Sequence, residues 1–68
     1  MKNRIRVLRA EHNLSQADLA QKTQVSRQSI NAIESGKYVP STLLSLKIAC
    51  VFNVEVSNIF SLEEEDWK

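Results

Sequence analysis

The sequence predicts an all-α domain of five short helices, and three observations lead to this fold class. The chain of 68 residues contains one Gly and one Pro, so few positions interrupt regular structure. Val and Ile do not alternate with polar residues over any long window, which argues against a sheet. Ser residues stand directly before several stretches with apolar residues at helical spacing, as N-cap residues do. We therefore expect one helical domain over residues 1–62 and an acidic tail over residues 63–68.

The first two helices are defined by their apolar spacing and by one capping signal. A helix over about residues 3–12 would turn Ile5, Leu8 and Val7 inward. Ser15 is expected to cap the second helix, with Asp18 three residues later as the reciprocal partner of a capping box. This helix should end near residue 22.

Three further helices follow the same logic. Ser26 should cap a helix over residues 26–35 that stops at Gly36. After the loop "KYVPS", either Ser41 or Thr42 caps a fourth helix, whose segment "LLSLKIACVF" is apolar around most of its circumference. The segment "SNIF" is predicted to form a short fifth helix that closes the core with residues 59 and 60.

Charge is unevenly distributed along the chain. Residues 1–62 carry eight Lys or Arg and four Asp or Glu, whereas "EEED" at residues 63–66 is wholly acidic. A mildly basic body is compatible with nucleic-acid binding without being diagnostic of it. No apolar run approaches the roughly 20 residues that cross a bilayer, and the N-terminal segment lacks the apolar centre of a secretion signal. We expect a cytoplasmic protein that does not contact a membrane.

Cysteine and histidine usage excludes several kinds of site. Cys50 is the only cysteine and His12 the only histidine, which leaves no disulfide, zinc site or activated thiol. Cys50 has apolar neighbours and is expected to be buried. The chain also lacks a paired-carboxylate motif and a glycine-rich phosphate loop, so we expect neither an enzyme nor a protein with a metal or cofactor.

The helix predicted over residues 26–35 has two different faces. Advancing about 100° per residue places Ile30 and Ile33 on one side. The opposite side carries Arg27, Gln28 and Asn31. Arg can bond bidentately to guanine, and Gln or Asn to adenine, in a major groove wide enough for an α-helix. The alternative is an ordinary solvated face, although such faces more often carry Glu and Lys.

The preceding segment favours the nucleic-acid interpretation. "SQADLAQKTQVSRQSINAIES" has small and apolar residues at the spacings of a helix-turn-helix, with Ala20 at the crossing and Val25 in the turn. From Asn3 to Phe60 the chain resembles the phage-repressor, Cro and XRE type of helix-turn-helix transcription regulators. The resemblance implies a five-helix lambda-repressor-like fold. One departure is Gln24, where many members have Gly, so the turn either strains a non-glycine residue or takes a different path.

The resemblance also implies roles for individual residues. Arg27, Gln28 and Asn31 would read bases in the major groove, and Arg9 and Glu34 would form a structural ion pair. Gln16 and Lys37 are alternatively just solvated, and Tyr38 could instead cover the edge of the core. The residues expected to contact the DNA backbone are Gln16, Ser26, Ser29, Lys37 and Tyr38.

The function implied is sequence-specific binding of double-stranded DNA by a transcription regulator. We expect a repressor, since the chain leaves no room for an activation or effector-binding domain, and a homodimer on a palindromic operator. The dimer surface would use the outer apolar residues of "LLSLKIACVF", Ile59, Leu62 and the tail. For the tail two alternatives stay open, a short strand against its symmetry mate or disorder. The alternative function is a protein-interaction module, such as an antitoxin or accessory subunit on the same fold.

Overall fold

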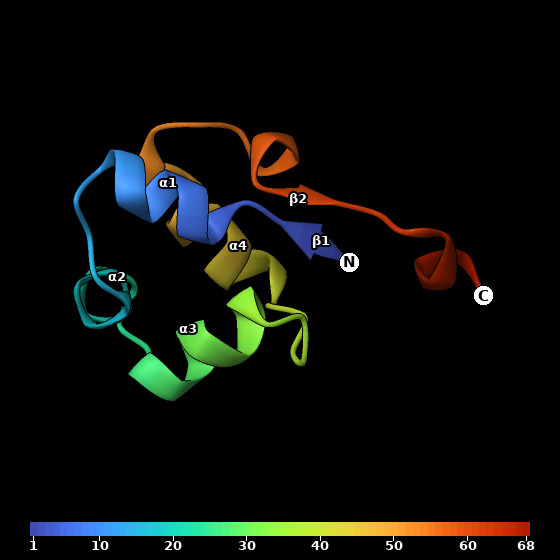
Figure 1. Cartoon of the computed structure of the whole chain (residues 1–68), viewed down its shortest axis with the longest axis horizontal. Coiled ribbons are helices and arrows are strands. Elements are labelled where there is room, and N and C mark those ends of the chain that lie inside the picture. Colours follow the sequence, from blue (N-terminus) through green and yellow to red (C-terminus); the bar gives the residue numbers. More distant parts are fainter.

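Four α-helices form the body of the protein, as a computed structural model that describes residues 1–68 shows. They are α1 (Ile5–Glu11), α2 (Gln16–Thr23), α3 (Arg27–Glu34) and α4 (Thr42–Phe52). Helices α2 and α3 follow one another through a tight turn, and α4 packs against α2 (Figure 1). This arrangement leaves one side of α3 at the surface.

Serine side chains begin three of these helices, as the sequence predicted. Ser15, Ser26 and Ser41 each accept a hydrogen bond from the backbone N–H three residues later. At Ser15 the capping box is complete, because Asp18 also accepts from the Ser15 N–H at 3.0 Å. The backbone and hydroxyl hydrogen bonds from Ser15 lower the pKa of Asp18. At its other end α3 stops before Gly36, whose φ of 80° turns the chain away.

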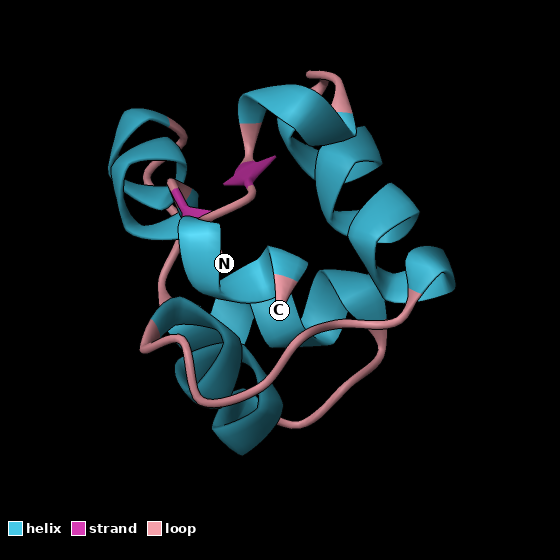
Figure 2. Ribbon diagram, turned by 90° about the vertical axis from the view of Figure 1, so that its right-hand side faces the viewer, coloured by secondary structure: helices cyan, strands magenta, loops and turns pink.

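The expectation of an all-α chain is wrong at both ends of the domain. Strand β1 (Lys2–Asn3) pairs antiparallel with β2 (Phe60–Ser61), and the two lie side by side in Figure 2. Helix α1 therefore starts at Ile5 rather than at residue 3, because the backbone of Asn3 is extended and paired with Phe60. The sequence had left two alternatives for the tail, a short strand against a symmetry mate or disorder. In the structure Ser61 pairs with Lys2 of the same chain, and residues Glu64–Trp67 form a 3₁₀ turn.

The predicted fifth helix is also wrong in type. Residues Val56–Asn58 form a single 3₁₀ turn, η1, closed by bonds from Asn58 N–H to Glu55 and from Ile59 N–H to Val56. A segment of three residues is too short to supply the successive i to i−4 bonds of an α-helix. Beyond β2 the chain runs away from the body to a second 3₁₀ turn, η2 (Glu64–Trp67) (Figure 1).

The hydrophobic core draws on every helix and on the segment around η1. Ile5, Leu19, Ile30 and Ile48 are fully buried. Ile59 and Phe60 close this core as predicted, so Ile59 is not available to a dimer surface. The remaining members of the twelve-residue core are Leu8, Ala20, Ile33, Leu44, Ala49 and Phe52.

Two expectations about burial are wrong. Val7 is 49% exposed, and Cys50 is exposed as well. Each lies two positions from a buried residue of its own helix, Ile5 or Ile48, which is about 200° around the axis. No helix in the structure combines the length and the apolar character needed to cross a bilayer.

The turn between α2 and α3 answers the question raised by Gln24. Its φ of 62° and ψ of 40° place it in the left-handed region, so the chain strains a non-glycine residue instead of taking another path. The turn is held by a bond from Val25 N–H to the Ala20 carbonyl at 3.0 Å, and Val25 packs against the core. The Gln24 side chain accepts from Lys47 Nζ at 3.3 Å.

Replacing Gln24 by Gly should stabilise the protein. Glycine adopts the left-handed conformation without steric cost, and this gain outweighs its greater entropy in the unfolded chain, so we expect Gln24→Gly to raise the free energy of unfolding by about 0.5 to 1 kcal/mol. Urea unfolding followed by circular dichroism measures the change. Gln24→Ala is the matched control, because it removes the contact with Lys47 but keeps the strain. If Gln24→Gly were no more stable than Gln24→Ala, the strain assigned to this turn would be wrong.

Candidate nucleic-acid interface

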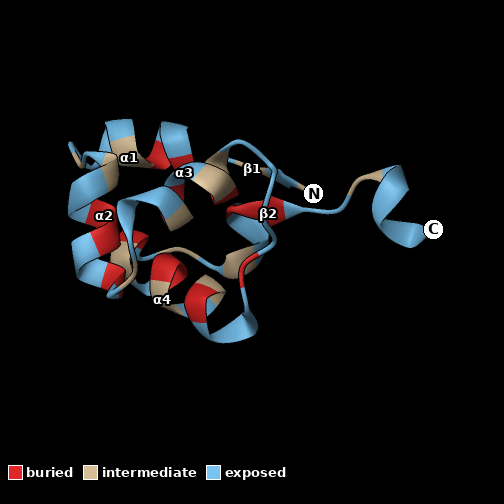
Figure 3. Ribbon diagram, turned by 90° about the horizontal axis from the view of Figure 1, so that it is seen from below, coloured by how far each residue is buried: buried red, intermediate tan, exposed pale blue.

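The outer face of α3 carries polar side chains that no other part of the chain covers. Arg27, Gln28 and Asn31 are all exposed, whereas Ile30 and Ile33 on the opposite face are 0% and 2% exposed. Figure 3 shows this division along the helix. Together with Gln16 the three exposed residues line a shallow depression of about 330 Å³ that contains no hydrophobic residue. The three side chains predicted to read bases therefore lie on one accessible surface.

The N-terminal end of α3 is organised by two hydroxyl groups. Ser26 Oγ accepts from the backbone N–H of Ser29 at 3.1 Å, and the two hydroxyl oxygens lie 2.9 Å apart. Ser26 is exposed and Ser29 half-buried. Both hydroxyls thus lie at the positive end of a helix, where a phosphate oxygen is favoured.

The loop after α3 brings two further predicted residues to the surface. Lys37 is exposed, and Tyr38 is 50% exposed. Tyr38 also lines a depression with Val25, Ser29 and the start of α4. Tyr38 thus lies near the core residue Leu44, which lines the same depression, and half of its surface is accessible to a partner.

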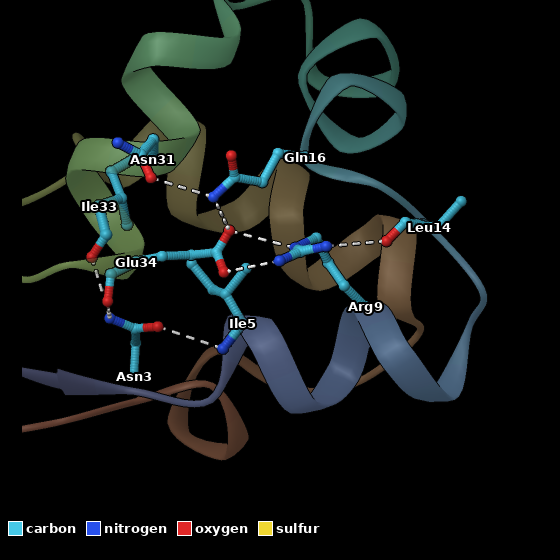
Figure 4. A network of polar contacts seen from close by, with 8 residues as sticks. All are labelled: Asn3, Ile5, Arg9, Leu14, Gln16, Asn31, Ile33 and Glu34. Carbon is cyan, nitrogen blue, oxygen red and sulfur yellow. Dashed lines mark hydrogen bonds and ion pairs between the residues drawn. The ribbon is translucent and has the colours of Figure 1, made fainter.

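An ion pair joins α1 to the end of α3. Arg9 Nη2 and Nε donate to the two carboxylate oxygens of Glu34 at 3.0 and 3.1 Å (Figure 4). Arg9 Nη1 also donates to the Leu14 carbonyl at 3.0 Å, which fixes the loop before α2. The Glu34 side chain is 4% exposed and that of Arg9 16%. The two residues named as a structural pair are thus in bidentate, largely buried contact.

Gln16 connects this ion pair to the polar face. Its Nε2 donates to Glu34 Oε2 at 3.1 Å and to Asn31 Oδ1 at 3.2 Å (Figure 4). Sequence reasoning assigned Gln16 to the DNA backbone and did not foresee these bonds. They depend on how α2 crosses α3, and no local signal in the sequence specifies that crossing.

Asn3 is a second residue that sequence reasoning missed. Its Nδ2 donates to the carbonyls of Ile33 at 3.0 Å and Glu34 at 3.4 Å, and its Oδ1 accepts from the Ile5 N–H at 3.2 Å. One side chain thereby satisfies orphan groups at the start of α1 and at the end of α3. Asn before an apolar helical segment was the available signal, because Asn is a preferred residue at helix starts.

Comparison with known proteins relates this geometry to a family. Residues 5–59 match the family model described as helix-turn-helix. An uncharacterised HTH-type transcriptional regulator of Methanocaldococcus jannaschii is 53% identical over 97% of this chain and 100% of its own length. The uncharacterised HTH-type transcriptional regulator YgzD of Bacillus subtilis is 47% identical over the same shares.

A solved structure resembles this fold closely. The restriction-modification controller protein C.AhdI of Aeromonas hydrophila superposes with a TM-score of 0.76 at 30% identity, covering 82% of this chain and 85% of that one. The lambda-repressor-like arrangement of α1 to α4 is thereby confirmed, with the short sheet as an addition to the predicted fold.

Loss of the Glu34 carboxylate should destabilise the protein strongly. Glu34→Ala leaves the Arg9 guanidinium largely buried without its counter-charge, and we expect the free energy of unfolding to fall by about 3 kcal/mol. Urea unfolding measures the loss. Glu55→Ala removes an exposed carboxylate and should change stability by less than about 0.5 kcal/mol. Equal stability of the two variants would mean that the ion pair contributes nothing to folding.

Proposed function

The chain belongs to the helix-turn-helix family of transcriptional regulators, and from this premise we propose that it binds a palindromic operator as a homodimer and represses transcription. Members of this family act by binding DNA and not by catalysing a reaction. In the proposed complex, α3 lies in the major groove of double-stranded DNA. The observation that carries the proposal is the exposed row of Arg27, Gln28 and Asn31, anchored from behind by buried isoleucines.

The chemistry of this row suits base edges. Arg27 presents a planar guanidinium that can bond bidentately to guanine O6 and N7, and Gln28 can bond adenine N6 and N7. Both side chains are exposed, so neither needs to break a buried contact before reaching a base. Direct contacts of this kind give a preference for one sequence, which is what an operator-specific protein requires.

Contacts with phosphate would fix the register of α3 in the groove. Ser26 and Ser29 lie at the N-terminus of α3, and Lys37 and Tyr38 follow its C-terminal end. Gln16 begins α2, whose first backbone N–H groups lack intrahelical acceptors. Amide, hydroxyl and ammonium donors at both ends of α3 can therefore hold phosphates on either side of the groove.

A second copy is proposed to cover the apolar surface on the side where the tail departs. One recognition helix reads only a few base pairs, whereas two helices about 34 to 36 Å apart read two half-sites. Leu46 and Leu62 are 55% and 59% exposed, and Trp67 is 78% exposed. Leu46 also lines a groove of about 210 Å³, together with Met1, Val39, Pro40, Val56 and Phe60. Exposed apolar residues gathered in this way are typical of a subunit interface.

Repression would follow from occupancy. A dimer seated in successive major grooves excludes other proteins from the same stretch of promoter DNA. No bound effector and no second activity are needed for this effect, so the DNA-binding surface described here is sufficient for it.

Arg27→Ala and Gln28→Ala should each weaken operator binding by about 1 to 3 kcal/mol, because each removes one base contact. The operator is first identified by selection from a random DNA pool, and affinity is then measured by gel-shift titration. Lys22→Ala is the matched control, since Lys22 lies beside His12 and Val51, away from the polar face.

Parent-like affinity of both variants would contradict the assignment of the reading face. A salt titration distinguishes DNA binding from the alternative function, because phosphate contacts make DNA affinity fall steeply as the salt concentration rises. A nearly flat salt dependence would favour a protein-interaction module instead.

Leu46→Glu should convert the dimer to a monomer, because it places a charge in the centre of the proposed apolar interface. Sedimentation velocity measures the state of association. Val7→Glu alters an equally exposed apolar residue on α1 and should leave the dimer intact. A dimer that survives Leu46→Glu would place the interface elsewhere.

A further inference from the structure

We infer that the buried Glu34 carboxylate fixes the direction of the Gln16 and Asn31 carboxamides, so that Asn31 acts only as a hydrogen-bond donor toward the base it meets. Asn31 would then select a base with an acceptor in the major groove and reject cytosine. The inference rests on the proposed insertion of α3 into that groove. It assigns Gln16 and Glu34 as positioning residues for specificity.

The first step is set by the chemistry of a carboxylate. An ionised carboxylate accepts hydrogen bonds and donates none. Both Glu34 oxygens are engaged by the Arg9 guanidinium, at 3.0 and 3.1 Å. The Gln16 atom that lies 3.1 Å from Glu34 Oε2 must therefore be the amide nitrogen, because an amide oxygen there would face a negatively charged acceptor.

The second step passes this direction to Asn31. The Gln16 amide group has two hydrogens, and the one not used by Glu34 points to Asn31 at 3.2 Å. The Asn31 atom that receives it must be the carbonyl oxygen, Oδ1. Flipping the Asn31 carboxamide would bring two donors together and lose this hydrogen bond. Figure 4 shows the resulting order of Glu34, Gln16 and Asn31.

The hydrogen bonds from Gln16 to Glu34 and to Asn31 form a relay, and Asn31 is its exposed end. Asn31 Nδ2 stays free, so the side chain presents a donor, whereas a free asparagine can rotate its amide to present either group. Purine N7, guanine O6 and thymine O4 are acceptors in the major groove, but cytosine presents the N4 amino donor. A fixed donor therefore meets cytosine with a repulsive contact that a rotating amide would avoid.

The relay also changes what Gln16 offers to DNA. Both hydrogens of its amide are used within the protein, and only the acceptor Oε1 remains. An acceptor cannot bond a phosphate oxygen. A phosphate beside Gln16 would therefore be held by the backbone N–H groups at the start of α2 and not by the Gln16 carboxamide.

Base preferences at individual operator positions test the inference. Affinities for operators with each base at each position are measured for the parent, and the position contacted by Asn31 is the one where Asn31→Ala removes the preference. There we expect the parent to reject cytosine by about 10-fold or more. Gln16→Met preserves length and volume but removes the donor, and it should reduce this rejection to about 2-fold at that position alone.

Two variants of the ion pair separate positioning from folding. Glu34→Gln allows either amide direction and should relax the same position as Gln16→Met. Arg9→Lys weakens the ion pair but keeps the Glu34 carboxylate, so it should lower stability and retain the rejection of cytosine. Because Gln16→Met leaves the ion pair intact, the test does not depend on the folding of Glu34→Gln.

Four outcomes would overturn the inference, and they differ in what else they affect. If Gln16→Met kept the full rejection of cytosine, the relay alone would fail. The same holds if it relaxed every position equally, since that would indicate a tilt of the whole helix. If Asn31→Ala changed no preference at any position while Arg27→Ala did, Asn31 would not read DNA. If neither Asn31→Ala nor Arg27→Ala changed a base preference at any position, the placement of α3 in the groove would be overturned as well.

Discussion

The Glu34 carboxylate is the one group that touches all three helices of the DNA-binding half of the molecule. It belongs to α3, pairs with Arg9 of α1 and accepts from Gln16 of α2. A carboxylate that is 4% exposed is costly to remove from water, and its cost is offset only when charged and polar partners surround it in good geometry. No buried side-chain nitrogen or oxygen in the structure lacks a hydrogen-bond partner. The relative positions of α1, α2 and α3 are therefore constrained by the need to satisfy this group.

The apolar face of α3 also fixes the position of this helix. Ile30 and Ile33 bury the inner face in a core of twelve residues, while Asn3 holds the carbonyls at the C-terminal end. Asn3 lies in β1, which is paired with β2 after the core has closed around Ile59. The two-residue strands thus tie both ends of the domain to the C-terminal end of α3. Polar contacts at the edge of this small core therefore add to the apolar contacts that hold α3 in place.

The parts of this fold that could be predicted are those fixed by local chemistry. Caps at Ser15, Ser26 and Ser41 depend on atoms within three residues, so their sequence signal is complete. Strands of two residues have no periodicity, which is why β1 and β2 were missed. Because apolar residues surround most of α4, its sequence does not indicate which face turns inward, and the predicted burial of Cys50 was wrong for that reason. The same distinction holds for the candidate site. The exposed face of α3 could be predicted from the helical spacing of its apolar residues. The hydrogen bonds of Gln16 and Asn3 could not, because they depend on how elements distant in the sequence cross in space.

The polar face itself contains two kinds of residue. The Arg27 and Gln28 side chains are exposed and make no hydrogen bond within the chain, so they can be replaced without disturbing the fold. Asn31 is also exposed, but its carbonyl oxygen is held by Gln16 and through it by Glu34. A change at Asn31 that removes this acceptor leaves a Gln16 hydrogen unsatisfied and loosens the relay behind it. Substitutions at Arg27 and Gln28 therefore leave the contacts of the fold unchanged, whereas a substitution at Asn31 also removes a hydrogen bond between α3 and α2.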